Sequence, residues 1–275
     1  MARLFAFIGN RSDLGPRILD VEAEALRTRA RAERLGWGLG FYQAGEVLLR
    51  KRPWDEREEI SVSALARDVR TDVLVGNVRS INFGEARTQN TQPYRFRNWL
   101  FAHAGTTAEF LRLRERLIAS IPDFLRRNVR GDTDSELLFH LFLSFLHDAG
   151  HLRGATPRPA TTEALRGSRA VIDRLSREEG AEDAGPMGLI VSNGEYVAGL
   201  NRGAHMAFRV IHGSEDIEAL LPDDGLRRRR LPDMARVRFT ILASEVPEPR
   251  PGWTLLPDRS TVVLGRLDEP VVETF

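Results

Sequence analysis

Histidine, serine, threonine, arginine and acidic side chains in this sequence are able to do chemistry, but none of its 275 residues is a cysteine. A thiolate nucleophile, a disulfide and a cysteine metal site are therefore excluded. His147 and His151, which follow His140, have the i, i+4 spacing that places two metal ligands on one helical face. Gly150 interrupts that face and no H-E-x-x-H motif accompanies it, so the pattern favours a solvated helix end and no metal site.

Arginine supplies nearly all of the positive charge. Lys51 is the only lysine, which we interpret as a compositional habit of the source genome. The run from Arg227 to Arg230 has four adjacent guanidinium groups, which can grip phosphates. However, acidic residues precede the run, no aromatic residue is interleaved with it, and 40 basic residues balance 39 acidic ones to a formal charge of +1. We therefore predict a solvated loop and no nucleic-acid partner.

The composition, with 42% hydrophobic and 29% charged residues, is that of an ordinary globular protein. A chain of this length can bury roughly 75% of the surface that its unfolded form exposes. No window of 18 apolar residues predicts a membrane span, and charged residues cut the N-terminal apolar run too short for a signal peptide. We therefore expect a cytoplasmic protein with no membrane partner.

Hydrophobic patterning predicts strands towards both ends of the chain and helices between them. The predicted strands are residues 4–8, 37–42, 46–49, 73–78, 98–103, 187–192, 196–201, 207–211, 236–243 and 260–264. The predicted helices are residues 20–35, 60–68, 107–121, 135–147 and 162–177, with loops at 152–167 and 178–186. This order predicts a single layered α+β domain over residues 1–275.

Short fragments in a fixed order then become more informative than composition. They are M-A-R-L-F at 1–5, G-W-G-L-G-F-Y at 36–42, G-N-V-R at 76–79, N-T-Q-P-Y at 90–94, N-W-L-F-A-H-A-G at 98–105, D-T-D-S-E at 132–136, V-S-N-G at 191–194 and L-A-S-E at 242–245. In that order and spacing, the sequence resembles the class II glutamine amidotransferases. It is most similar to their small single-domain bacterial type, which includes the amidohydrolase of ergothioneine biosynthesis.

The resemblance implies a four-layer α-β-β-α sandwich of two antiparallel sheets, of the N-terminal-nucleophile hydrolase type. It implies a reaction at the side-chain amide of glutamine or of a γ-glutamyl compound, without a cofactor. The family's nucleophile is a cysteine that becomes the first residue after methionine is removed, and its own α-amino group is the base. An Asn-Gly pair holds the oxyanion, an arginine grips the substrate carboxylate and an aspartate grips its amino group.

Several binding groups of the family have a counterpart in this sequence. Arg79 matches the carboxylate-binding arginine, a role that suits a bidentate guanidinium. Asp134 matches the aspartate that holds the ammonium group, and Gly105 matches the glycine of the oxyanion pair. Trp37 and Gly38 match the tight strand that lines the site.

Other positions depart from the family, and these departures decide the expected chemistry. Ala2 occupies the nucleophile position, and Ala104 occupies the position of the oxyanion asparagine. Asn77, a candidate ligand contact, stands where histidine is usual, and Gln92 where histidine is common. A methyl group cannot attack a carbonyl. Because losing a nucleophile costs roughly 10⁶ in turnover and losing one oxyanion donor about 10²–10³, we predict no glutaminase activity.

Each retained residue also has a structural explanation. Arg79 in an apolar strand can pair with a buried carboxylate, and Asp134 can serve as a helix N-cap. His103 and Trp37 are typical of core positions.

Three functions remain open at this point. The first is a catalytically inactive family member that binds a small amino-acid-like ligand, such as glutamine or a γ-glutamyl compound, or a protein partner. The second is a glutamine or γ-glutamyl amidohydrolase whose nucleophile is replaced in this sequence, and the third is a structural or regulatory subunit without a ligand. A different chemistry in the same pocket would need His103, Ser80, Thr106 or Thr107 within hydrogen-bond reach of one another.

Overall fold

Two antiparallel sheets form the centre of the computed structural model, which describes residues 2–29, 35–80, 86–220, 234–246 and 250–275. One sheet has, in spatial order, β13 (Thr254–Leu255), β11 (Ala207–His212), β12 (Arg238–Ala243), β1 (Ala2–Gly9), β6 (Val73–Ser80), β3 (Leu35–Gln43) and β4 (Glu46–Asp55). The other has β15 (Val271–Thr274), β14 (Ser260–Leu264), β10 (Val197–Arg202), β9 (Met187–Ser192), β8 (Trp99–Gly105) and β7 (Tyr94–Phe96). A separate pair joins β2 (Thr28–Arg29) to β5 (Glu59–Ile60).

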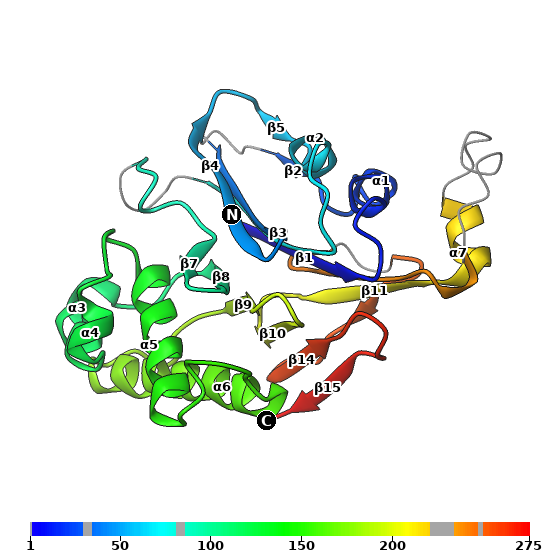
Figure 1. Cartoon of the computed structure of the whole chain (residues 1–275). Coiled ribbons are helices and arrows are strands. Elements are labelled where there is room, and N and C mark those ends of the chain that lie inside the picture. The colour runs from blue at the N-terminus through cyan, green and yellow to red at the C-terminus, as the bar shows by residue number, and fades with distance from the viewer. Residues whose placement is uncertain (1, 30–34, 81–85, 221–233, 247–249) are drawn as a thin grey trace.

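Helices cover the outer face of each sheet (Figure 1). The seven-stranded sheet is covered by α1 (Gly15–Val21), α2 (Val62–Ala66) and α7 (Gly213–Leu220). The six-stranded sheet is covered by α3 (Phe110–Ala119), α4 (Asp123–Arg126), α5 (Asp134–Asp148) and α6 (Arg158–Glu178). A short 3₁₀ helix, η1 (Met234–Arg236), precedes β12. The arrangement confirms the predicted α+β sandwich with α-β-β-α layers.

Side-chain alternation along the strands separates the layers. On β1, Leu4 and Ala6 pack between the two sheets, whereas Phe5 and Phe7 pack under the outer helices. On β8, Leu100 and Ala102 face the inter-sheet layer. Because successive side chains point to opposite faces of a strand, a continuous apolar strand serves two cores at once.

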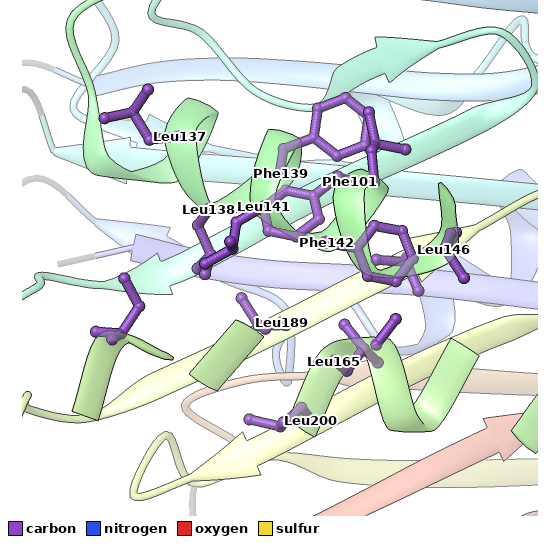
Figure 2. Packing of buried hydrophobic residues seen from close by; sticks show 14 of the residues in the cluster. Phe101, Leu137, Leu138, Phe139, Leu141, Phe142, Leu146, Leu165, Leu189 and Leu200 are labelled. Atoms are coloured by element: carbon purple, nitrogen blue, oxygen red, sulfur yellow. The ribbon is translucent and has the colours of Figure 1, made fainter. Parts of the chain in front are cut away.

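Helix α5 anchors the second helical layer. Its N-cap is Thr133, whose Oγ1 accepts a hydrogen bond from the Glu136 N–H at 3.3 Å. Figure 2 shows the apolar residues of α5 packed on β8–β10 and on α6, with Phe142 beside Phe101. The helix therefore begins at a fixed residue and is held along its length by the core.

The predicted helix over 20–35 is wrong over its described residues after Val21, which are 22–29 and 35. Helix α1 ends at Val21, turns follow, and Thr28–Arg29 form β2, whereas residues 30–34 lie outside the described residues. Glu22 is buried there, where its carboxylate accepts hydrogen bonds from Arg209 and, at 2.8 Å, from Trp253 Nε1. These tertiary contacts outweigh the helical propensity of a charge-rich segment that has few apolar positions.

Other boundaries also differ from the sequence prediction. The predicted loop over 152–167 is wrong in its second half, because α6 begins at Arg158 with Pro159 in its first turn, a position that proline favours. The helix predicted over 107–121 begins later, at Phe110, after Glu109 with a positive φ of 58°. The short elements β2, β5, β7, β13, β15, α4 and α7 lacked a periodic signal and were not predicted.

Two further sequence-based expectations concern a membrane-spanning segment and the arginine run. Within the part of the chain that the structure describes, no helix is both long and apolar enough to cross a membrane. The arginine run at 227–230 lies outside the described residues.

Candidate active site

The start of the chain lies beside Arg79. Strands β1 and β3 both pair with β6, and their register places Ala2 and Gly36 on either side of Arg79. Arg79 lies four and six residues after Val75 and Val73, which pack between the sheets, so it belongs to the same face of β6. The predicted nucleophile position and the predicted carboxylate-binding residue are therefore neighbours in space.

A cavity of about 730 Å³ opens at this end of the sheets. Four of the predicted site residues line it: Arg79, Ala104, Gly105 and Asp134. The remaining lining comes from β6, β8, the start of α3 with the segment before it, the start of α5 and four separate loops. These residues are Ser80, Gln92, His103, Thr106–Arg112, Thr133, Ser135, Pro186, Ala204 and Glu245. The cavity gathers residues that are far apart in the sequence.

Arg79 supplies the free cationic group of this cavity. Its Nη2 atom is buried and has no hydrogen-bond partner among the described residues. Burial lowers the pKa of Arg79, whereas the nearby Tyr94 and Asp134 raise it. Because a guanidinium stays protonated even so, the unpaired nitrogen can donate to a ligand carboxylate.

Asp134 lies in the first turn of α5 and holds the loop before α3. Its Oδ2 accepts from the Thr107 N–H at 2.9 Å, and its Oδ1 accepts from the Ser135 N–H at 2.7 Å. The expectation that Asp134 caps the helix is wrong, because Thr133 occupies that position. A carboxylate has about four acceptor sites, so Asp134 keeps capacity for a ligand ammonium group.

A buried polar network lies beneath Asp134. The Gln92 side chain accepts from the His103 N–H and donates to the His103 carbonyl at 3.0 Å and to Ser135 Oγ at 3.2 Å. Ser135 Oγ lies 2.9 Å from His103 Nδ1 and 3.2 Å from Asp134 Oδ1. Burial lowers the pKa of His103, and its Nε2 has no partner among the described residues, although the Asp134 charge opposes that shift. The imidazole is thus neutral, with one ring nitrogen free beside the cavity.

The oxyanion pair is half retained. Gly105 has a φ of 132°, and a Cβ placed there would lie 2.3 Å from the Pro186 carbonyl oxygen. Glycine is therefore required at this position. Ala104 lines the same cavity but offers only a methyl group, so one side-chain donor of the family pair is missing.

Asn77 lies two residues before Arg79 on β6 and is not among the residues that line the cavity. It is buried between Leu4 and Gly38, and neither of its amide atoms has a hydrogen-bond partner among the described residues. A Cβ at Gly38 would lie 2.0 Å from the Gln92 carbonyl oxygen. Glycine at this position therefore allows the loop before β7 to approach β3 closely beside the site.

Trp37 is not brought to the cavity. It packs in the outer core of the seven-stranded sheet, and its Nε1 donates to Asp55 Oδ2 at 2.8 Å. Arg57 and then Trp37 hold the pKa of Asp55 well below its usual range, although burial opposes them. The Trp37 side chain thus packs in the core, which is the structural explanation given for it in the sequence analysis.

Sequence reasoning missed part of this site. Ser135 follows directly after Asp134 in the sequence. The family match at Asp134 could therefore have identified Ser135 as a neighbour in the network. Pro186, Ala204 and Glu245 carry no motif that would have marked them, because only the sheet topology brings them to the cavity.

Two of the three histidines considered as a metal cluster, His140 and His147, have other surroundings. His140 is buried with Nδ1 2.9 Å from the Glu136 carbonyl oxygen, whereas His147 is exposed and packs edge-on against Phe124. Within the described ranges, no group of three or more potential ligand side chains could hold a metal ion.

Comparisons with known proteins agree on one family. A family model described as "Glutamine amidotransferases class-II" matches residues 11–213. A curated Saccharomyces cerevisiae protein, "Probable glutamine amidotransferase DUG3", is 26% identical over 125 residues, which are 42% of this chain and 34% of that protein. The chain thus matches about a third of that relative's length.

Solved structures share the fold over almost the whole chain. A glutamine aminotransferase class-II domain protein from Silicibacter pomeroyi has a TM-score of 0.62 at 20% identity, with 99% of both chains covered. Glutamine phosphoribosylpyrophosphate amidotransferase from B. subtilis has a TM-score of 0.56 at 11% identity, covering 99% of this chain and 49% of that one. These likenesses confirm the predicted N-terminal-nucleophile type of sandwich.

Proposed function

Because the chain belongs to the class II glutamine amidotransferases, we propose that it is a catalytically inactive member that still binds glutamine or a γ-glutamyl compound beside Arg79. The observation that carries the proposal is the unpaired, buried Nη2 of Arg79 in a cavity of about 730 Å³. A buried charged donor without a partner is costly, and a ligand carboxylate relieves that cost. We also propose that the protein is cytoplasmic and that it binds a protein partner.

The positions of the remaining polar groups support an amino-acid ligand. Asp134 lines the same cavity as Arg79, so a carboxylate and a guanidinium are available for the two charged groups of a free amino acid. Gly105 and the free His103 Nε2 lie in that cavity, where they can meet the side-chain amide. A subunit without any ligand is less well supported, because its pocket would be filled by side chains.

The lost groups support inactivity. Ala2, in register with Arg79, has no nucleophilic side chain, and Ala104 has no donor for an oxyanion. The alternative, a glutamine or γ-glutamyl amidohydrolase whose nucleophile is replaced in this sequence, shares the same binding groups.

Glutamine or a γ-glutamyl amide at saturation is expected to raise the melting temperature. A ligand at about 100 times its Kd adds roughly 2.7 kcal/mol. For a chain of this size that is a shift of about 5–10 °C, measurable by differential scanning fluorimetry. Arg79→Met is expected to abolish the shift.

The matched control is Arg114→Met. Arg114 makes a half-exposed ion pair with Glu115 on α3 and does not line the cavity, so this variant should keep the full shift. If no compound in the series stabilises the unsubstituted protein, the ligand-binding proposal is wrong.

A further inference from the structure

A second cavity, of about 500 Å³, lies where the edges of the two sheets meet. It is lined by β4, β7, the loop after α4 and the first turns of α5. Tyr94 lines this cavity and Thr133 lines the Arg79 cavity, and their hydroxyl groups hydrogen-bond at 2.6 Å. The two cavities are therefore neighbours separated by one hydrogen-bonded pair.

Lys51 is the only member of its Arg-Lys-Arg triplet that faces this cavity. Arg50 donates to the Leu65 carbonyl near α2 at 3.3 Å, and Arg52 pairs with Asp55 at 3.7 Å, both on the outer side of the sheet. Lys51 is in register with Gly38 and faces the inner side. All other basic side chains of the sequence apart from histidine are arginines, and its only lysine faces the inner side of the sheet.

The Lys51 ammonium has no counterion in the described structure. Its Nζ lies 5.5 Å from the centroid of the Tyr94 ring and makes no hydrogen bond or ion pair with a described residue. Burial lowers the pKa of Lys51 to about 8, although the charge of Glu136 opposes this shift. A partly buried ammonium in this position is stabilised by an anion.

The one carboxylate among the described residues that line the cavity, that of Glu136, already accepts hydrogen bonds from the backbone. The Glu136 carboxylate accepts from the Arg130 N–H at 2.9 Å and from the Gly131 N–H at 2.6 Å. His140 is close by, with Nδ1 bonded to the Glu136 carbonyl, and burial lowers its pKa. The imidazole is thus neutral, and its Nε2 remains an acceptor for a protonated ligand oxygen.

The charge of the lining favours a multiply charged anion. Four basic side chains line the cavity, Lys51, Arg95, Arg97 and Arg130, against the single carboxylate of Glu136. A phosphate monoester carries about −1.5 to −2 charges and three acceptor oxygens, whereas a carboxylate carries one charge. The phosphate matches this excess of cations better.

The floor of the cavity is aromatic. Tyr94 and Phe139 are buried and stack with their centroids 6.3 Å apart, and Phe96 adds a half-buried ring. Such a surface suits a flat or apolar body attached to the anion.

We propose that this cavity binds a small phosphate monoester with an aromatic or apolar body, and that Lys51 holds its phosphate. Arg97 and Arg130 complete the anion site, and Tyr94 and Phe139 contact the body. The proposal requires nothing of the Arg79 cavity.

The single lysine makes the test unusually direct. Lys51 and the α-amino group are the only primary amines for an N-hydroxysuccinimide ester to acetylate, and peptide mass spectrometry separates the two products. We expect Lys51 to react with a midpoint near pH 8, reflecting its lowered pKa. Phenyl phosphate at about ten times its Kd is expected to slow acetylation of Lys51 about tenfold and leave the α-amino rate unchanged.

Variants and competing anions complete the test. Arg97→Met and Arg130→Met should weaken protection, whereas Arg126→Met, an exposed residue paired with Asp123 outside the cavity, should not. Arg79→Met should leave protection intact, which separates this result from that of the first cavity.

Three outcomes would overturn the proposal. Equal protection of Lys51 by sodium chloride of the same ionic strength shows general screening by salt and no phosphate site. Equal protection by benzoate at the same concentration excludes the phosphate class. An acetylation midpoint near that of a free lysine, about 10.4, shows an ammonium fully in water.

Discussion

Ala2→Cys combined with Ala104→Asn is expected to give the chain an ammonia-releasing activity on glutamine that the unsubstituted protein lacks. The first change supplies a thiol beside the α-amino group once Met1 is removed, and the second supplies the missing oxyanion donor. The register of β1 and β6 already places position 2 beside Arg79, so no backbone movement is required. The measurement is ammonia release from glutamine and γ-glutamyl amides.

The single variants set the scale of this effect. Ala104→Asn alone should stay silent, because the nucleophile is worth roughly 10⁶ in turnover. Ala2→Cys alone should be about 10²–10³ slower than the double variant, because it lacks one oxyanion donor. Adding Arg79→Met to the double variant should remove the activity by removing the carboxylate anchor.

The absence of any native cysteine gives this experiment an internal check. Iodoacetamide can label only the introduced thiol, and intact mass shows whether Met1 has been removed. If the unlabelled double variant has lost Met1 and a separate sample shows its thiol to be reactive, the absence of ammonia release contradicts a retained glutamine pocket. The proposed function would then fail together with the alternative of an amidohydrolase whose nucleophile is replaced in this sequence.

Short-range patterns in the sequence predicted much of the fold. Strands such as β6 and β9 are rich in apolar residues because both of their faces are buried along most of their length. The helix predicted over 20–35 is wrong at residues 22–29 because contacts distant in the sequence decide the conformation there. One of them is a buried contact from Glu22 to Arg209, which lies far away in the sequence.

The candidate site was also predicted only in part. The family fragments identified Arg79, Gly105 and Asp134, and the structure gathers them in one cavity. Trp37, matched by the same means, faces the other side of its sheet. Alternation along a strand fixes the face only once the register is known, and a shift of one residue reverses it.

The Lys51 cavity was invisible to the sequence for a related reason. Composition alone presented Lys51 as an exception to an arginine bias. Only the pairing with Gly38 shows that it turns inward, and only the position of β7 places Tyr94 over it. Chemistry at the meeting edges of two sheets depends on tertiary structure.

Phe142→Ala is expected to destabilise the protein by about 3–5 kcal/mol, the usual cost of removing a fully buried aromatic side chain. Phe142 is 0% exposed and packs edge-on against Trp99, with centroids 5.3 Å apart, and against Phe101 (Figure 2). Urea unfolding followed by circular dichroism measures the loss. Phe124→Ala, on α4 with a side chain 43% exposed, is the matched control and should cost less than about 1 kcal/mol.

The same substitution also tests whether α5 positions both cavities. The helix carries Asp134 at the first cavity and His140 at the second, and Phe142 fixes it on β8. A loosened helix should therefore weaken both the glutamine-dependent melting shift and the phenyl phosphate protection of Lys51. If Phe142→Ala lowers stability as expected but leaves both ligand responses unchanged, the start of α5 is held by its cap at Thr133 and by the loop contacts of Glu136, independently of the core.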